Sequence, residues 1–170
     1  MNTCRFLGIV AALALAAGCT SFGAAKLDPG MSRAEVEKAM GKPTETIVGA
    51  SGDTLLYFSR LPGGRSIYKA TIGADGKLKS EAEQTLTRRN IAGIKQGAQA
   101  KDVRELLGPP YKSGLKKVSV GFESVERDVW EYPWSDGEQM RLLWLQFSGG
   151  ALREKVDGFD FEADKSKQLN

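Results

Sequence analysis

Apolar residues recur at helical spacing in two short segments of the chain. Segment 33–40 is preceded by Ser32, and Glu35 follows three positions later, which is the pattern of a capping box at the start of a helix. Gly41 favours a positive φ and Pro43 prevents continuation, so we expect the helix to end there. A helix of about eight residues is too short to persist alone in water, so it must pack on another element.

The second segment, 100–107, repeats this pattern with a weaker start. Gln99 stands where the first segment has Ser32, so the short hydroxyl side chain that caps a helix well is missing. A shorter helical turn is expected at 90–94. The residues that we expect to face the core from the second helix are Val103, Leu106 and Leu107.

Between and after these helices, apolar runs bounded by turn residues predict strands. We expect strands at 53–59, 66–73, 77–86, 128–134, 140–147 and 151–161, with a further strand at 117–124. Asp75-Gly76 and Gly149-Gly150 are typical hairpin turns. Sequential hairpins give antiparallel sheets, and short helices can cover one face of each. The sequence therefore predicts an α+β fold.

The chain also repeats itself. Segment 29–43 matches 96–110 at a constant offset of 67, and 53–57 corresponds to 128–132 at an offset of 75, which leaves eight extra residues (75 − 67) in the second copy. We expect two tandem units, each a short helical layer packed on one face of a three- or four-stranded antiparallel sheet. The units are predicted at 27–88 and 89–162, followed by a flexible tail at 163–170.

The amino end has the three parts of an export signal. Arg5 provides a positive charge, 6–17 is an apolar run of about 12 residues, and small residues precede Cys19. A helix that spans a bilayer needs about 20 residues, so this run is too short for a permanent anchor.

The ending of this segment, 15–19, resembles the lipobox of bacterial lipoprotein precursors. The resemblance implies a signal peptide at 1–18, cleavage between Gly18 and Cys19, a lipid on Cys19, and a lipidated tether at 19–26. A residue other than Asp after the cysteine, here Thr20, fits sorting to the outer membrane. The alternative is a plain secreted protein that is cut near Ala17 and keeps a free thiol.

Composition narrows the chemistry. The chain has no histidine, which removes Ser-His-Asp and Cys-His nucleophiles and most zinc sites. Its two cysteines are assigned to the signal and the lipid, and a net charge of +3 without a basic run does not favour nucleic acid. The acidic cluster near the end fits a solvated terminus better than a carboxylate pair; its members are Asp157, Asp160, Glu162 and Asp164. We therefore expect no enzyme, no metal and no cofactor other than the covalent lipid.

Aromatic residues of the second unit are candidates for partner binding. Trp130, Tyr132 and Trp134 alternate along one strand and therefore share one face, and Trp144 lies on the next strand. Since the short helices cover only one face, either this row or Trp144 should be core while the other is exposed. Trp and Tyr are frequent in binding hot spots but also fill cores.

The combined motifs resemble the SmpA/OmlA (BamE-like) family of outer-membrane lipoproteins, present here as a tandem repeat. They are 30–32, 40–43 and 53–57 in the first unit, and 97, 107–110 and 128–132 in the second. Leu55 stands where the family usually has Trp. Two tandem units of this architecture are also similar to the β-lactamase inhibitory proteins.

These resemblances imply a protein on the periplasmic face of the outer membrane, held there by its lipid. We expect it to act as a protein-binding module, with a role in outer-membrane protein assembly or envelope maintenance, and to have a protein partner in the envelope. The alternative is an inhibitor of an envelope or secreted enzyme, which requires both sheets to form one continuous concave surface with exposed aromatic residues. No small-molecule substrate and no nucleic acid is expected.

Overall fold

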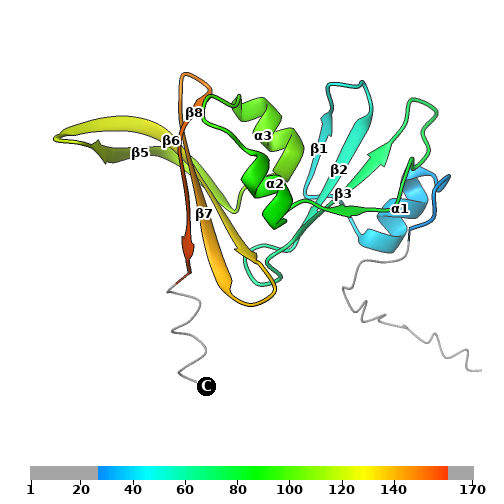
Figure 1. Cartoon of the computed structure of the whole chain (residues 1–170). Helices are drawn as coiled ribbons and strands as arrows, with labels where there is room; N and C mark the ends of the chain where they lie inside the picture. The colour runs from blue at the N-terminus through cyan, green and yellow to red at the C-terminus, as the bar shows by residue number, and fades with distance from the viewer. Residues whose placement is uncertain (1–26, 161–170) are drawn as a thin grey trace, which may run out of the picture.

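A computed structural model describes residues 27–160, which form two four-stranded antiparallel sheets and three helices (Figure 1). Sheet 1 contains β1 (Glu45–Val48), β2 (Thr54–Ser59), β3 (Ile67–Ile72) and β4 (Glu83–Gln84), in this spatial order. Sheet 2 contains β5 (Lys112–Val120), β6 (Glu123–Ser135), β7 (Met140–Ser148) and β8 (Ala151–Phe159), also in this order. The helices are α1 (Arg33–Met40), α2 (Arg88–Gly93) and α3 (Ala100–Leu107). The prediction of an α+β chain with two antiparallel sheet units is confirmed.

The helix ends follow the local sequence signals. At the start of α1 the Ser32 backbone N–H donates to Glu35 Oε2 at 2.8 Å, and the Ser32 hydroxyl accepts from the Glu35 backbone, which completes the capping box. At the start of α3 Gln99 makes no side-chain cap, as expected. Helix α2 begins two residues before the predicted turn because Thr87 caps it through the Asn90 backbone N–H.

Two hydrophobic cores separate the molecule into layers. One core joins α1 to one side of sheet 1; its members are Leu27, Val36, Met40, Leu56, Phe58, Ala70, Ile72 and Leu78. The larger core takes residues from both sheets and from α2 and α3; it includes Leu55, Tyr57, Ile67, Ile91, Val103, Leu107, Trp130, Tyr132, Trp134, Leu143, Leu145 and Phe147. Helices α2 and α3 therefore lie between the two sheets (Figure 1).

Two strand predictions need correction, and one strand was not predicted. The predicted strand 77–86 is reduced to the two residues of β4, because Lys77 and Leu78 form isolated bridges with Ser32 and Ile72 instead. Strand β1 was not expected, since only four residues mark it. The predicted strand 117–124 is also wrong in its bounds: β5 already begins at Lys112, and Gly121 and Phe122 form its turn.

The hydrogen bonds and strand pairs of the two units correspond, with a register that differs by one residue from the sequence alignment. Backbone hydrogen bonds link Leu78 to Gly30 and Met31 in unit 1, and Leu152 to Gly97 and Ala98 in unit 2. Helix starts and β1/β5 thus correspond at an offset of 67, whereas Leu78 and Leu152 differ by 74.

The same offset of 74 relates β2 to β6. Leu56 and Phe58 of β2 face α1. Their counterparts in β6, Trp130 and Tyr132, face α3. The match of Asp53 with Asp128 is therefore wrong by one position, and the counterpart of Trp130 is Leu56, not Leu55. A slip of one residue exchanges the two faces of a strand.

Candidate partner-binding surfaces

The aromatic row of β6 is core rather than a surface for a partner. Trp130, Tyr132 and Trp134 are at most 7% exposed, and their rings lie against the helices between the two sheets. The indole N–H of Trp130 donates to Asp128 at 2.8 Å and that of Trp134 to Asp157 at 3.0 Å, so their polar atoms are also satisfied. This corrects the assignment of these three residues as partner-binding candidates.

The fourth candidate, Trp144, lies on the opposite face of sheet 2 and is partly exposed. Its ring covers Gly158 of β8, where an added Cβ would lie 3.7 Å from the indole. Of the four predicted aromatic residues, Trp144 is therefore the one whose side chain a partner could contact.

The carboxyl end of α3 is held by hydroxyl groups from both sheets. Tyr57 of sheet 1 donates to the Glu105 carbonyl at 2.6 Å, and Tyr132 of sheet 2 donates to the Gly108 carbonyl at 2.9 Å. Thr85 adds a third hydrogen bond, to the Leu107 carbonyl at 2.7 Å. The last carbonyls of a helix have no partner within the helix, so these bonds replace the missing ones.

Both phenols remain protonated for this task. Burial raises the pKa of Tyr132 far above its usual value, and burial together with the nearby Glu105 carboxylate raises the pKa of Tyr57 in the same direction. The two hydroxyls therefore act as permanent hydrogen-bond donors rather than as acid–base groups.

A two-stranded arm extends from sheet 2. In unit 1, five residues (49–53) join β1 to β2, whereas in unit 2 the hairpin continues past the Leu115–Asp128 pair for the twelve residues 116–127. These seven additional residues account for the difference between the offsets of 67 and 74. Strand β7 pairs with β6 only from Asp128 onward, so the arm has no third strand (Figure 1).

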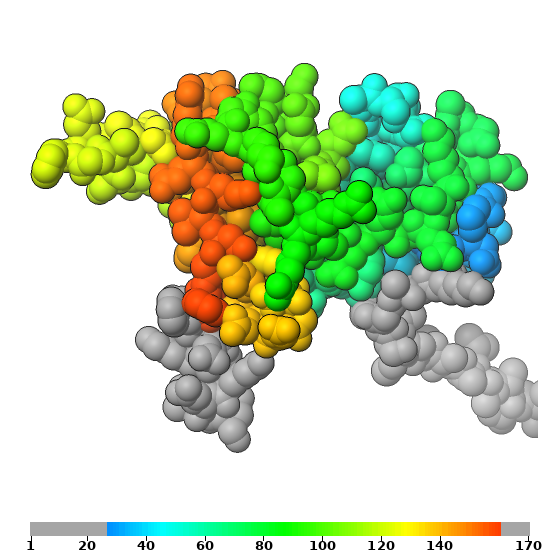
Figure 2. All heavy atoms as spheres, viewed as in Figure 1, coloured from blue at the N-terminus to red at the C-terminus, as the bar shows by residue number. Residues whose placement is uncertain are grey.

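The arm carries apolar side chains into solvent. Phe122 at its turn is fully exposed, Val120 is exposed, and Leu115 is exposed at the base of the arm. In the space-filling view the yellow arm stands clear of the rest of the molecule (Figure 2). An isolated two-stranded hairpin is only marginally stable in water. These residues were not among the partner-binding candidates, although the extra length of the second unit was a signal for an insertion at this place.

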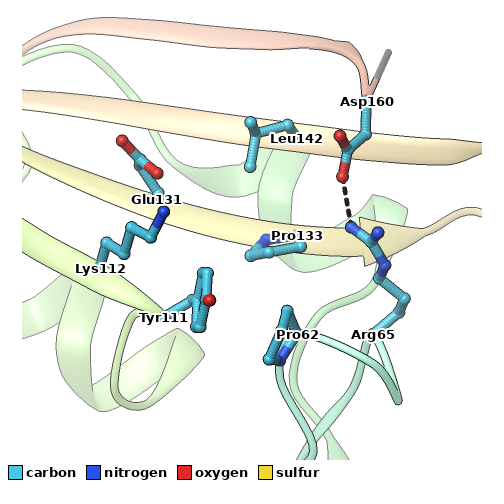
Figure 3. A pocket seen from close by; sticks show the side chains of 8 residues that line it. All are labelled: Pro62, Arg65, Tyr111, Lys112, Glu131, Pro133, Leu142 and Asp160. Carbon is cyan, nitrogen blue, oxygen red and sulfur yellow. Dashed lines mark hydrogen bonds and ion pairs between the residues drawn. The ribbon is translucent and has the colours of Figure 1, made fainter. Parts of the chain in front are cut away.

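A shallow depression of about 210 Å³ lies on the face of sheet 2 that carries Trp144 (Figure 3). It is lined by Pro62, Arg65, Tyr111, Lys112, Glu131, Pro133, Leu142 and Asp160. Arg65 comes from the loop after β2 and forms an ion pair with Asp160 at the end of β8, so the two units meet at its rim. Lys112 lies over the ring of Tyr111, with Nζ 5.2 Å from the ring centroid.

The carboxylates of the predicted acidic cluster do not converge in the described part. Asp157 accepts from Trp134 and pairs with Arg141, whereas Asp160 pairs with Arg65. Glu162 and Asp164 lie outside the described residues. Within 27–160, no group of three or more acidic, cysteine or histidine residues could hold a metal ion.

The predictions for the amino end also fall outside the described residues. These are the signal peptide 1–18, the cleavage site between Gly18 and Cys19, the lipid on Cys19 and the tether 19–26. Among residues 27–160, no helix has the length and apolar character needed to cross a membrane.

Comparisons of the chain with models of known protein families, with curated proteins and with solved structures gave no match.

Proposed function

We propose that this chain is a lipid-anchored protein-binding module on the periplasmic face of the outer membrane, related to the SmpA/OmlA (BamE-like) family. In this proposal Cys19 carries the lipid, each unit has a short helical layer packed on one face of its own sheet, and the partner is a protein of the envelope. Outer-membrane protein assembly or envelope maintenance is the setting that the resemblance suggests. No catalytic role is proposed.

The observation that carries this proposal is the arm, residues 116–127. Its apolar turn is exposed, it lacks the third strand that a stable sheet needs, and it is the part that unit 2 has in addition to unit 1. Large exposed apolar side chains on a projecting hairpin favour a contact with another protein. Anchoring by a lipid raises the effective concentration near membrane partners, so a small contact can suffice.

The geometry does not favour the inhibitor alternative. That function requires one concave surface made by both sheets, with aromatic residues exposed on it. The two sheets are not hydrogen-bonded to each other, and α2, α3 and the buried aromatic row fill the space between them. We therefore do not retain an inhibitor as a second candidate.

The lipid anchor is tested by the substitution Cys19→Ser in the full chain. We expect the variant to move from the membrane fraction to the soluble fraction and to lose labelling by a fatty acid, because two or more acyl chains are needed for lasting attachment. Substitution of the other cysteine, Cys4→Ser, is the matched control and should keep both membrane association and label. A Cys19→Ser protein that stays in the membrane fraction would contradict the anchor.

The arm is tested by photo-crosslinking from position 122 in cells, in place of Phe122. We expect one envelope protein to be crosslinked. The separate variant Phe122→Ser should recover at least tenfold less of this partner. Its free energy of unfolding should change by less than about 0.5 kcal/mol, since the side chain is exposed. Position 48 is the control, because Val48 is also exposed but lies at the short hairpin of unit 1. Equal recovery from both positions would count against a specific contact at the arm.

A further inference from the structure

One face of sheet 1 is covered by a helix, whereas the equivalent face of sheet 2 is not. We name the face of each sheet that is turned away from its own unit's long helix the outer face. On sheet 1 the outer face carries Leu55, Tyr57 and Ile67, and α3 of the second unit lies on it. On sheet 2 the outer face carries Val129, Glu131 and Leu142, and no helix of residues 27–160 lies on it (Figure 1).

The contact of α3 with the outer face of sheet 1 is well defined. Arg104 Nε donates to Glu45 Oε1 at 2.8 Å, and the Tyr57 hydroxyl bonds the Glu105 carbonyl. Gly108 packs so closely that an added Cβ would lie 2.6 Å from Tyr57 Cδ1 and 3.1 Å from Ile67 Cγ2. A helix with glycine at its end therefore fits between a residue of β2 and a residue of β3.

The register identifies the corresponding positions on sheet 2. Glu45 pairs with Tyr57 in sheet 1, as Lys112 pairs with Glu131 in sheet 2. Ile67 pairs with Ser59, as Leu142 pairs with Pro133. Lys112, Glu131, Pro133 and Leu142 line the depression in Figure 3, so this depression lies where sheet 1 receives Gly108.

Helix α1 of unit 1 corresponds to α3 of unit 2. The side of α1 that faces away from sheet 1 is accessible. Gly41 corresponds to Gly108 and has nearly the same φ, 85° against 83°, but no atom lies within 4 Å of a Cβ built on it. Lys38 and Gly41 are exposed and Glu37 is half-buried. At its carboxyl end α1 therefore has the same backbone conformation as α3. The side of α1 that corresponds to the sheet-1-facing side of α3 is accessible.

The ion pair between α3 and sheet 1 has counterparts of reversed charge on α1 and on sheet 2. Arg104 of α3 meets Glu45 of sheet 1, and the counterparts of these residues are Glu37 of α1 and Lys112 of sheet 2. Glu105 meets Tyr57 through its backbone carbonyl, so this second contact carries no charge pair. A helix like α1, placed on sheet 2 as α3 is placed on sheet 1, would thus bring the opposite charges of Glu37 and Lys112 together.

From this correspondence we infer that the outer face of sheet 2 binds helix α1 of a second copy of this chain, with Gly41 in the depression beside Leu142 and with Glu37 facing Lys112. Such a contact joins two different surfaces, so it continues the stacking of units from one molecule to the next and gives open chains or rings. It is independent of the arm, and either proposal can fail without the other.

The test is sedimentation of the full chain, extracted from membranes in detergent, over a range of concentrations. We expect concentration-dependent assembly beyond a dimer. Glu37→Lys and Lys112→Glu, each alone, should raise the concentration for half-assembly about tenfold, because an exposed attraction becomes a repulsion. The double variant should return it to within about twofold of the original value, since each contact then again joins opposite charges.

Lys101→Glu is the matched control, because it makes the same charge change at an exposed position of α3 that lies outside both proposed contact surfaces, and it should leave assembly unchanged. Circular dichroism of each variant checks that the fold is kept. A chain that stays monomeric, as it would if its own residues or another protein covered this face, overturns the proposal. Assembly that responds equally to all single variants, without recovery in the double variant, overturns it too.

Discussion

Replacing Trp134 by alanine is expected to lower the free energy of unfolding by about 3–5 kcal/mol, the range for removing a large aromatic side chain from a core. Its indole is 2% exposed, lies in the core between the two sheets, and donates to Asp157. Truncation would leave a cavity and would remove one of the two side chains that donate to the Asp157 carboxylate, the other being Arg141. Urea unfolding of the full chain, followed by tryptophan fluorescence, measures the change.

Trp144→Ala is the matched control for this experiment. The residue type is the same and the strand is the neighbouring one, but the side chain is partly exposed on the outer face. We expect a loss of about 1 kcal/mol or less. Equal losses for the two variants would mean that sheet 2 does not bury the face assigned here.

The second large effect is expected at Gly108. In Gly108→Ala the methyl group would lie 2.6 Å from Tyr57 Cδ1, with φ at 83°, so a steric clash adds to an unfavourable backbone conformation. The positive φ is combined with an extended ψ of −166°, a region that only glycine adopts readily and that costs another residue about 1–3 kcal/mol. Overpacking adds about 1–3 kcal/mol. We expect a total loss of about 2–6 kcal/mol in the free energy of unfolding.

Gly41→Ala separates these two contributions. Gly41 has nearly the same φ and ψ, yet nothing lies within 4 Å of an added methyl group, so only the backbone contribution of about 1–3 kcal/mol should remain. The difference between the two alanine variants, from urea unfolding under the same conditions, measures the close approach of α3 to sheet 1. If the two losses are the same, α3 does not pack on Tyr57 as described.

Sequence alone predicted the elements that have local signals. The capping box of Ser32 and Glu35, the positive φ of Gly41 and the alternation of Trp130, Tyr132 and Trp134 each depend on a few neighbouring residues, and all three are present. The sequence also required that only one aromatic row of sheet 2 be buried, which is what the structure has.

The register of β2 was not predictable in the same way. Leu55, Leu56, Tyr57 and Phe58 are all buried, because sheet 1 is covered on both faces. A strand that is buried on both sides has no alternation from which the helix-facing side could be read. The aspartates at 53 and 128 then gave an alignment that was one residue off.

The candidate surfaces depended on the tertiary structure. The depression takes Pro62 and Arg65 from unit 1 and Lys112 and Leu142 from unit 2, and no local pattern relates these positions. In the sequence, the arm was indicated only by the additional residues of the second unit. The expected strand at 117–124 runs across the turn of the arm, because Val118, Val120 and Phe122 alternate with polar or small residues on both sides of Gly121.

The larger core has a consequence for how the molecule comes apart. Since Leu55, Tyr57 and Ile67 of sheet 1 share it with Trp130 and Tyr132 of sheet 2, separating the halves would expose an apolar surface on each of them. Heating or denaturant should therefore melt both halves in one cooperative transition, and neither half is a viable fragment by itself. The two repeated halves should therefore behave as a single thermodynamic unit and not as two independent domains.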